Sequence, residues 1–134
     1  MSYEQILYDV ADGIATITLN RPEKLNAWTM RMGLEVRHAF HAADRDAGVR
    51  VILITGAGKG FSAGADVDEL RQVVERGDED LGRRLVEGAR AVGNLIRGAA
   101  QPVLASINGV AAGGGANLAL ACDLRIASDT AKIG

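Results

Sequence analysis

Two short runs of small residues have the composition and the placement needed to bind an anionic oxygen through the main chain. One run is Phe61-Ser62-Ala63-Gly64-Ala65-Asp66 and the other is Gly113-Gly114-Gly115-Ala116-Asn117. Each follows an apolar, strand-like segment and leads into a predicted helix. Residues without bulk let a ligand approach the backbone closely, so N–H groups at two helix starts can converge on one oxygen. Such a pair would form an oxyanion hole, which stabilises negative charge on a carbonyl oxygen.

Either run alone is equally well explained by packing, because glycine and alanine also permit turns and close contact between a helix and a sheet. The presence of both runs favours a ligand site. Two strand-to-helix joints without bulky side chains, in a parallel sheet, occupy the position at which such sheets bind ligands.

The first half of the chain predicts a β-hairpin, a helix and a buried strand. Residues 6–10 and 14–19 are rich in β-forming side chains, and the Asp-Gly pair between them favours a hairpin turn. Thr29 can cap a helix that runs to about residue 47. Residues 51–54 are continuously apolar, which predicts a strand buried on both faces of a parallel sheet.

The second half predicts three helical segments and two strands. A loop covers residues 56–64, and Asp66 and Glu69 have capping-box spacing before a short helical turn. Apolar residues then recur every three or four positions in a long amphipathic helix. The remaining elements are a strand at 103–107, a turn at 108–109, an apolar helix ending near residue 121 and a strand at 124–127. The predicted order is β-β-α-β-α-β-α-β in a single α/β domain.

Composition excludes several classes of protein. Of the 134 residues, 48% are hydrophobic and 24% are charged, which is typical of one globular domain. The net charge of -2 provides no excess of positive charge for nucleic acid. The acidic N-terminus does not resemble a secretory signal, and no apolar run could span a bilayer. We therefore expect a cytoplasmic protein without nucleic-acid or membrane partners.

Other candidate motifs favour structural interpretations. Lys59 is followed by glycine instead of Ser or Thr, and Phe61 stands where a dinucleotide fingerprint needs glycine, so the loop matches neither nucleotide motif. His38 and His41 are three residues apart, but no cysteine or carboxylate completes a metal site, and solvated helix positions explain them. Cys122 lies in an apolar run and is interpreted as core instead of a nucleophile.

Four stretches in sequence order resemble the crotonase superfamily, that is, the enoyl-CoA hydratase/isomerase family, and they span nearly the whole chain. They are Leu19-Asn20-Arg21-Pro22-Glu23-Lys24-Leu25-Asn26-Ala27, Val51-Ile52-Leu53-Ile54-Thr55-Gly56, Phe61-Ser62-Ala63-Gly64-Ala65-Asp66-Val67, and Ile107-Asn108-Gly109-Val110-Ala111-Ala112-Gly113-Gly114-Gly115 continuing to Ala121-Cys122-Asp123.

The resemblance implies a spiral of ββα units with mainly parallel buried strands that binds an acyl-CoA thioester. Coenzyme A then enters as part of the substrate, and no tightly bound cofactor or metal is expected. By motif position, the backbone N–H groups of Ala65 and Gly114 would hold the thioester carbonyl oxygen. This role fits the small residues of the two runs, because backbone N–H groups alone can polarise a thioester and stabilise its enolate.

The family also places the CoA nucleotide against the first and third stretches. The candidate contacts are Lys24, Leu25, Ala63, Asp66 and Val67. For Asp66, a helix cap is an equally good interpretation.

One position departs from the family pattern. Hydratases of the family that use two acids carry a glutamate two residues after the glycine run, and this chain has Asn117 there. An amide cannot act as a general base, although it can orient water or substrate through hydrogen bonds. The second family acid would fall just past Gly134.

We therefore expect an isomerase that uses one acid to shift a double bond or rearrange a ring. Enoyl-CoA hydratase is the alternative within the family, and a non-catalytic acyl-CoA binder or scaffold is the alternative of another class. Residues 1–134 are expected to form the N-terminal portion of a single crotonase-like domain and to be inactive alone. Family members are usually trimers or hexamers, so a homotrimer or hexamer is expected at full length.

Overall fold

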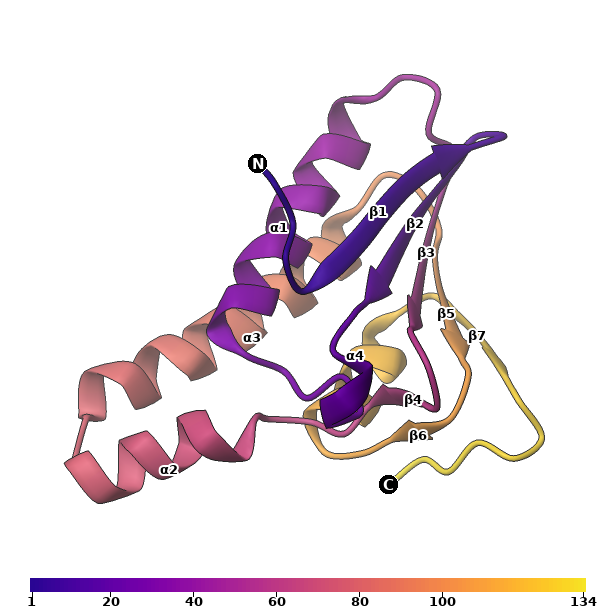
Figure 1. Ribbon diagram of the computed structural model, residues 1–134. Coiled ribbons are helices and arrows are strands. Elements are labelled where there is room, and N and C mark those ends of the chain that lie inside the picture. Colours follow the sequence, from indigo (N-terminus) through magenta and orange to yellow (C-terminus); the bar gives the residue numbers. More distant parts are fainter.

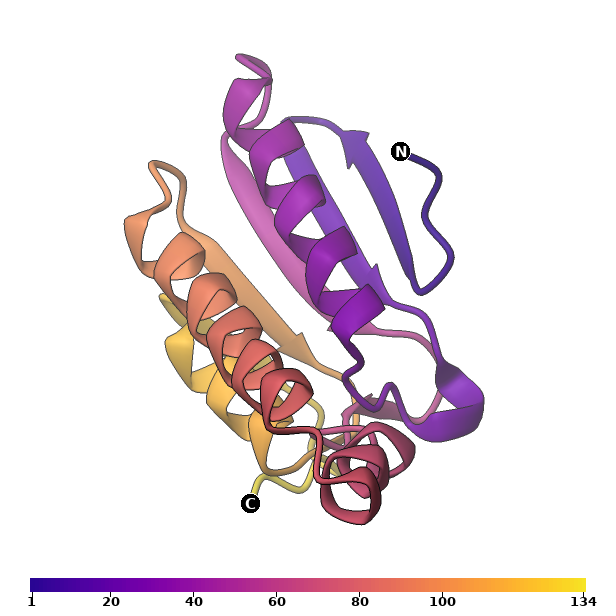
Figure 2. The same ribbon diagram turned by 90° about the vertical axis from the view of Figure 1, so that its left-hand side faces the viewer.

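The computed structural model describes residues 1–134 and contains a five-stranded sheet with helices on one face, as Figures 1 and 2 show. The strand order is β1-β2-β3-β5-β7; β1 is antiparallel to β2, and all other neighbours are parallel. The predicted α/β architecture with mainly parallel strands is confirmed. The strands are β1 (Ile6–Ala11), β2 (Ile14–Leu19), β3 (Val51–Gly56), β5 (Val103–Ile107) and β7 (Leu124–Ala127).

The predicted hairpin joins β1 to β2. Its two-residue turn places Asp12 at φ 54° and Gly13 at φ 80°, as a type I′ turn requires. Ala11 pairs with Ile14 directly beside the turn. The Asp-Gly pair therefore fixes the register of the first two strands.

Three of the four α-helices, those at Met30–Arg45, Glu79–Gly98 and Gly114–Ala121, follow the sequence pattern closely. Thr29 caps α1 by accepting a hydrogen bond from Met32 N at 3.0 Å, as predicted, and α1 ends two residues earlier than expected because Asp46 is extended. No helix is both long enough and apolar enough to cross a membrane. The helices are α1 (Met30–Arg45), α2 (Val67–Arg76), α3 (Glu79–Gly98) and α4 (Gly114–Ala121), and a 3-10 turn, η1, covers Pro22–Lys24.

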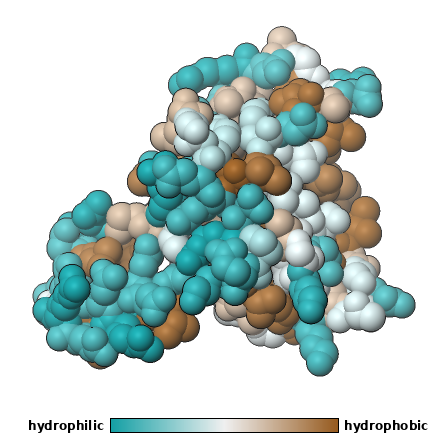
Figure 3. Space-filling view, viewed as in Figure 1, coloured by the Kyte–Doolittle hydropathy of each residue, from teal (hydrophilic) through white to brown (hydrophobic).

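The core lies between the sheet and the helices, and the other face of the sheet is only partly covered. Ile52 and Ile54 are fully buried, whereas Val51 and Leu53, which point to the opposite face, are half-buried. The prediction that residues 51–54 are buried on both faces is therefore wrong. Figure 3 shows apolar side chains along the edge where the strands lie in Figure 1. Exposed apolar residues of the strands include Leu7, Ile14, Leu124 and Ile126.

A second, two-stranded sheet lies where the sequence predicted only a loop and a turn. β4 (Gly60–Ser62) pairs in parallel with β6 (Val110–Ala111), with an irregularity between Gly60 and Ser62. Strands this short carry no period-two pattern, and their pairing joins segments far apart in the sequence. The small sheet aligns the two runs of small residues.

The segment after Asp66 forms a complete ten-residue helix, α2, instead of the predicted short turn. None of its residues is buried. The sequence underestimates it because it is short and packs no side chain into the core. Gly77, with φ 59°, ends it in a left-handed cap.

Candidate active site

Ala65 lies between two backbone hydrogen bonds that join its segment to Trp28. Trp28 N donates to Gly64 O at 2.7 Å, and Asp66 N donates to Trp28 O at 2.8 Å. Successive N–H groups of an extended chain point to opposite sides, so the N–H of Ala65 points away from Trp28. Ala65 is exposed, and its N–H donates to no acceptor in the chain. The bridge thus leaves one free backbone donor.

Gly114 provides a second free donor at the start of α4. The first N–H groups of a helix have no partner within the helix. Gly113 N donates to Gly134 O at 2.9 Å, and Gly115 N donates to Ala112 O at 2.8 Å. The N–H of Gly114, between them, donates to no acceptor, and the residue is exposed.

The structure brings these two residues together across the small sheet. A β-carbon placed on Gly114 would lie 4.0 Å from Ala65 N and 3.9 Å from Gly64 Cα. A β-carbon on Gly64, which has φ 94°, would lie 3.2 Å from Gly114 N. The two amide groups are therefore neighbours, although 49 residues separate them in the sequence.

The packing explanation for the small residues also holds. Ala112 N donates to Ser62 O at 3.0 Å, which joins the two runs directly. A β-carbon on Gly115 would collide with Ser62 O and lie 2.8 Å from Ser62 C. Glycine is required at position 115 for close packing, whereas Gly114 has room for a β-carbon.

Both free donors line one cavity of about 380 Å³ between α2, α3 and α4. Asn117 lines it from α4, one turn after Gly114, and its side chain is exposed. Most of the lining surface is apolar, as in typical small-molecule sites. The lining residues are Trp28, Ala65, Asp66, Glu69, Leu70, Leu85, Ala89, Arg90, Val92, Gly93, Asn94, Arg97, Gly114, Asn117, Leu118 and Ala121.

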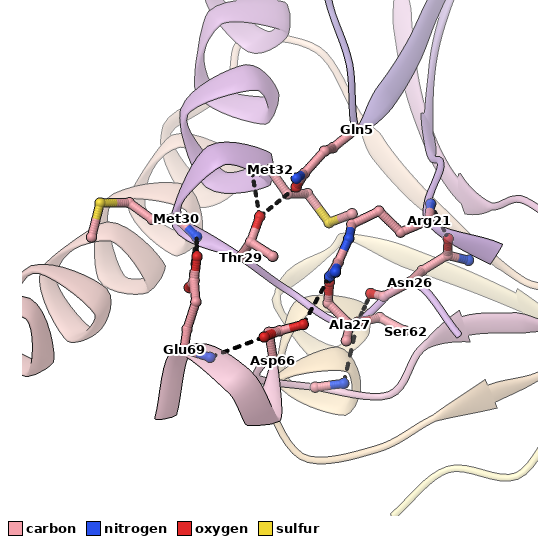
Figure 4. Close-up of polar contacts among 11 residues, drawn as sticks. Gln5, Arg21, Asn26, Ala27, Thr29, Met30, Met32, Ser62, Asp66 and Glu69 are labelled. Carbon is pink, nitrogen blue, oxygen red and sulfur yellow. Dashed lines mark hydrogen bonds and ion pairs between the residues drawn. The ribbon is translucent and has the colours of Figure 1, made fainter. Parts of the chain in front are cut away.

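The carboxylate of Asp66 is engaged within the protein, as Figure 4 shows. Oδ1 accepts from Glu69 N at 3.0 Å and caps α2, and Oδ2 accepts from Arg21 Nη1 at 3.0 Å. Burial alone would raise the pKa of Asp66, but these hydrogen bonds and the charge of Arg21 outweigh it and hold the pKa below its usual value. The helix-cap interpretation of Asp66 is confirmed.

Only half of the predicted capping box forms. Both carboxylate oxygens of Glu69 accept from Met30 N, at 3.0 and 3.2 Å, and so cap α1 instead of turning back to Asp66. Asp66 N is already bonded to Trp28 O, which explains the difference. Burial raises the pKa of Glu69, and the charge of Asp66 adds to this effect. Sequence reasoning missed Glu69 as a carboxylate of the cavity.

The other candidate CoA contacts lie on the surface. Lys24 and Leu25 end the η1 turn, and Leu25 O accepts from Ala63 N at 2.9 Å, so the first and third motif stretches touch. Val67, the first residue of α2, is 64% exposed. Lys24, Leu25 and Ala63 are also exposed.

Cysteine and histidine do not contribute to the cavity. Cys122 is buried, its thiol donates to Leu118 O at 3.4 Å, and burial raises its pKa to about 11. The thiol therefore stays protonated and belongs to the core, as predicted. His38 is exposed and its Nδ1 hydrogen-bonds to Tyr3 OH at 2.8 Å; His41 is also exposed. No three His, Cys, Asp or Glu side chains are grouped so that they could hold a metal.

Comparison with known proteins identifies the family. The enoyl-CoA hydratase/isomerase family matches residues 9–134. The chain belongs to the enoyl-CoA hydratase/isomerase family. An enoyl-CoA hydratase/isomerase from Xanthobacter autotrophicus Py2 is 38% identical, and its crystal structure superposes with a TM-score of 0.90 over 99% of this chain and 49% of that one. The crotonase-like fold is thereby confirmed.

Curated relatives of this family carry out different reactions. A trans-2-decenoyl-[acyl-carrier-protein] isomerase from Streptococcus mutans is 36% identical over 98% of this chain and 50% of its own length. A crotonyl-CoA hydratase from Syntrophomonas wolfei is also 36% identical, over 100% of this chain and 50% of its own length. The chain thus spans about half the length of the curated relatives it matches. Equal identity to an isomerase and a hydratase leaves the choice of reaction to the chemistry of the site.

Proposed function

We propose that the protein binds an acyl-CoA thioester in the cavity and stabilises its enolate. The observation that carries this proposal is the pair of neighbouring backbone N–H groups, of Ala65 and Gly114, that line the cavity and have no acceptor in the chain. Both residues are exposed, so their N–H groups are open to a ligand, and two neighbouring donors that line one cavity support a ligand oxygen there.

The thioester carbonyl oxygen would accept both hydrogen bonds. When a proton leaves the carbon next to the carbonyl, the electron pair moves onto this oxygen, and the donors stabilise the developing charge. One such donor lowers the barrier by about 3 kcal/mol, or roughly a hundredfold in rate. The small residues around the donors allow the thioester to approach the main chain.

Asn117 favours isomerisation within this chemistry. In an isomerisation, one proton leaves the acyl chain and one returns at another carbon, so a single acid suffices and no water is added. Asn117 cannot transfer the proton at neutral pH, but its amide can orient the acyl group. We assign proton transfer to a carboxylate outside residues 1–134, where the family resemblance places the second acid.

Hydration is the second candidate. The relative that is a crotonyl-CoA hydratase supports it, and the amide of Asn117 could hold the attacking water. Assays with a 2-enoyl-CoA and a 3-enoyl-CoA separate the reactions, because hydration removes the conjugated double bond and isomerisation of the 3-enoyl thioester creates it. Binding without either reaction would favour a non-catalytic acyl-CoA binder.

The proposed CoA contacts are Lys24, Leu25, Ala63 and Val67, which line the exposed junction of the first and third motif stretches. For Asp66 we propose an indirect contribution, because both of its oxygens already accept hydrogen bonds within the chain. We further propose that the full-length protein is a homotrimer or hexamer in the cytoplasm and that residues 1–134 alone are inactive. Light scattering and assays of both chain lengths test the assembly and the activity.

The decisive experiment compares two substitutions of Gly114 in the full-length protein. Gly114→Pro removes the N–H, and proline is tolerated at the first position of a helix. Gly114→Ala keeps the N–H and adds a β-carbon only 3.9 to 4.0 Å from its neighbours. We expect Gly114→Pro to slow exchange of the α-proton of a bound acyl-CoA for solvent deuterium about a hundredfold more than Gly114→Ala. Equal exchange rates in the two variants would contradict the oxyanion assignment.

A further inference from the structure

One wall of the cavity is basic. Arg90, Asn94 and Arg97 line it from α3, and their spacing of four and then three residues places them on one face of the helix. Gly93 lies beside them, and a β-carbon on it would meet no atom within 4 Å. The cavity therefore has open space next to two guanidinium groups and an amide.

The charge of these two arginines is not balanced within the chain. Arg83 and Arg84, on the same helix, form ion pairs with Asp80 or Glu87, but Arg90 and Arg97 form none.

The acids of the cavity do not supply the missing partners. Asp66 is paired with Arg21 at 3.0 Å, and Glu69 accepts from Met30 N. Both carboxylates that line the cavity are thus engaged elsewhere. The basic wall lacks an anion.

Arg97 lies at the end of the cavity far from the free donors. α3 leads into β5 and α4 leads into β7, and these strands are parallel neighbours in which Leu104 pairs with Leu124. The C-terminal ends of both helices therefore lie on the same side, as Figure 2 shows. Ala121, in the last turn of α4, also lines the cavity and is about 10 Å along the helix axis from Gly114. A thioester at Gly114 would extend its acyl chain toward the arginines.

We propose that the cavity selects acyl thioesters whose acyl chain carries a carboxylate at its far end. This inference rests on the proposed function, because the thioester fixes one end of the ligand at Ala65 and Gly114. Guanidinium groups bind carboxylates through paired, charge-assisted hydrogen bonds, and Asn94 adds an amide donor. The apolar lining between the two ends accommodates the methylene chain.

The test compares adipyl-CoA with hexanoyl-CoA, which have equally long acyl chains and differ in the terminal carboxylate. Binding of each to the full-length protein is measured by isothermal titration calorimetry. Both arginines are exposed and therefore screened by solvent, so we expect adipyl-CoA to bind about tenfold more tightly. In the double variant Arg90→Gln/Arg97→Gln, the preference for adipyl-CoA over hexanoyl-CoA should disappear. Arg76→Gln, which removes an exposed arginine that does not line the cavity, should preserve it.

The comparison also separates the acyl carboxylate from the phosphates of coenzyme A, since both ligands carry the same nucleotide. Equal loss of affinity for both ligands in the double variant would mean that the arginines bind the nucleotide, and the inference would be wrong. Equal affinity of the wild-type protein for both ligands would overturn it while leaving the proposed function intact. If neither thioester binds, the proposed function fails and the inference fails with it.

A second variant tests the path of the acyl chain. Gly93→Leu fills the open space beside the arginines without changing charge. It should weaken binding of adipyl-CoA and hexanoyl-CoA at least tenfold but leave acetyl-CoA, which is too short to reach it, unaffected. Unchanged binding of adipyl-CoA by this variant would contradict the placement of the chain.

Discussion

Arg21 and Asp66 form a nearly buried ion pair, with 3.0 Å between Nη1 and Oδ2. Nη1 of Arg21 also donates to Ala27 O at 2.7 Å, so this one guanidinium joins the segment after β2 to the start of α2. The N–H of Ala65 precedes Asp66 directly, and Asp66 N is fixed by Trp28 O. The ion pair therefore helps to set the direction of the free N–H of Ala65.

Two replacements of Asp66 should separate the contribution of the helix cap from that of the ion pair. Asp66→Ala removes the cap of α2 and leaves Arg21 without its partner, and we expect a loss of about 3 kcal/mol in the free energy of unfolding. Asp66→Asn keeps an oxygen for Glu69 N but removes the charge, and a loss of about 1 to 2 kcal/mol is expected. Urea denaturation measures both values. Equal losses in the two variants would show that the cap contributes nothing.

The ion pair also predicts the acid sensitivity of the protein. The folded pKa of Asp66 lies below its unfolded value, so its contribution to stability is complete above the unfolded pKa and is lost as the pH falls through the folded pKa. The difference in unfolding free energy between wild type and Asp66→Asn should thus shrink below about pH 4. Equilibrium unfolding between neutral pH and pH 3 measures this difference.

Glu69 should have the opposite pH dependence. Its folded pKa is raised, chiefly by burial, so the folded state keeps a proton that the unfolded state has released, and stability falls as the pH rises above the unfolded value of about 4.3. Glu69→Gln keeps an acceptor for Met30 N and should remove this decline. Glu75→Gln, which replaces an exposed acid of the same helix, is the matched control. A wild-type slope that persists in Glu69→Gln would assign the decline to another group.

The sequence predicts the elements that are determined by interactions between residues close together in the chain. The Asp12-Gly13 turn and the Thr29 cap are examples, because each acts through neighbouring backbone atoms. It does not predict the β4–β6 sheet, whose pairing joins distant segments and buries too few residues to leave a pattern. α2 is underestimated for a related reason, since none of its residues is buried.

The candidate site is likewise predicted only in part from the sequence. The small residues at 65 and 114 are visible as motifs, and the structure places them together. That the N–H of Ala65 is free depends on the bridge to Trp28, which no sequence pattern encodes. The direction of Arg90 and Arg97 depends on how α3 packs against α4. Ion pairs between residues distant in sequence, such as Arg21 and Asp66, can likewise be identified only from the fold.

Neighbouring glycines of α4 should differ sharply when replaced by alanine. In Gly115→Ala the β-carbon would collide with the backbone of Ser62, and strand β4 must shift, so we expect a loss of about 1 to 3 kcal/mol in stability. Gly114→Ala meets only ordinary contacts and should cost less than about 1 kcal/mol. Thermal unfolding of both variants tests the difference. Equal stability would mean that the close approach of α4 to β4 is not required.

Cys122 should behave as a core residue that cannot act as a nucleophile. Its thiol is buried and its pKa is raised to about 11 by desolvation, so at pH 8 roughly one molecule in a thousand carries the reactive thiolate. A disulfide reagent should therefore modify the folded protein slowly, at a rate set by transient opening, and modify the urea-unfolded protein at the rate of an ordinary thiol. In the full-length protein, Cys122→Ala should preserve turnover of an enoyl-CoA while lowering stability, since it removes a buried sulfur. Rapid labelling of the folded protein, or loss of turnover in a folded Cys122→Ala variant, would place the thiol in the reaction instead of the core.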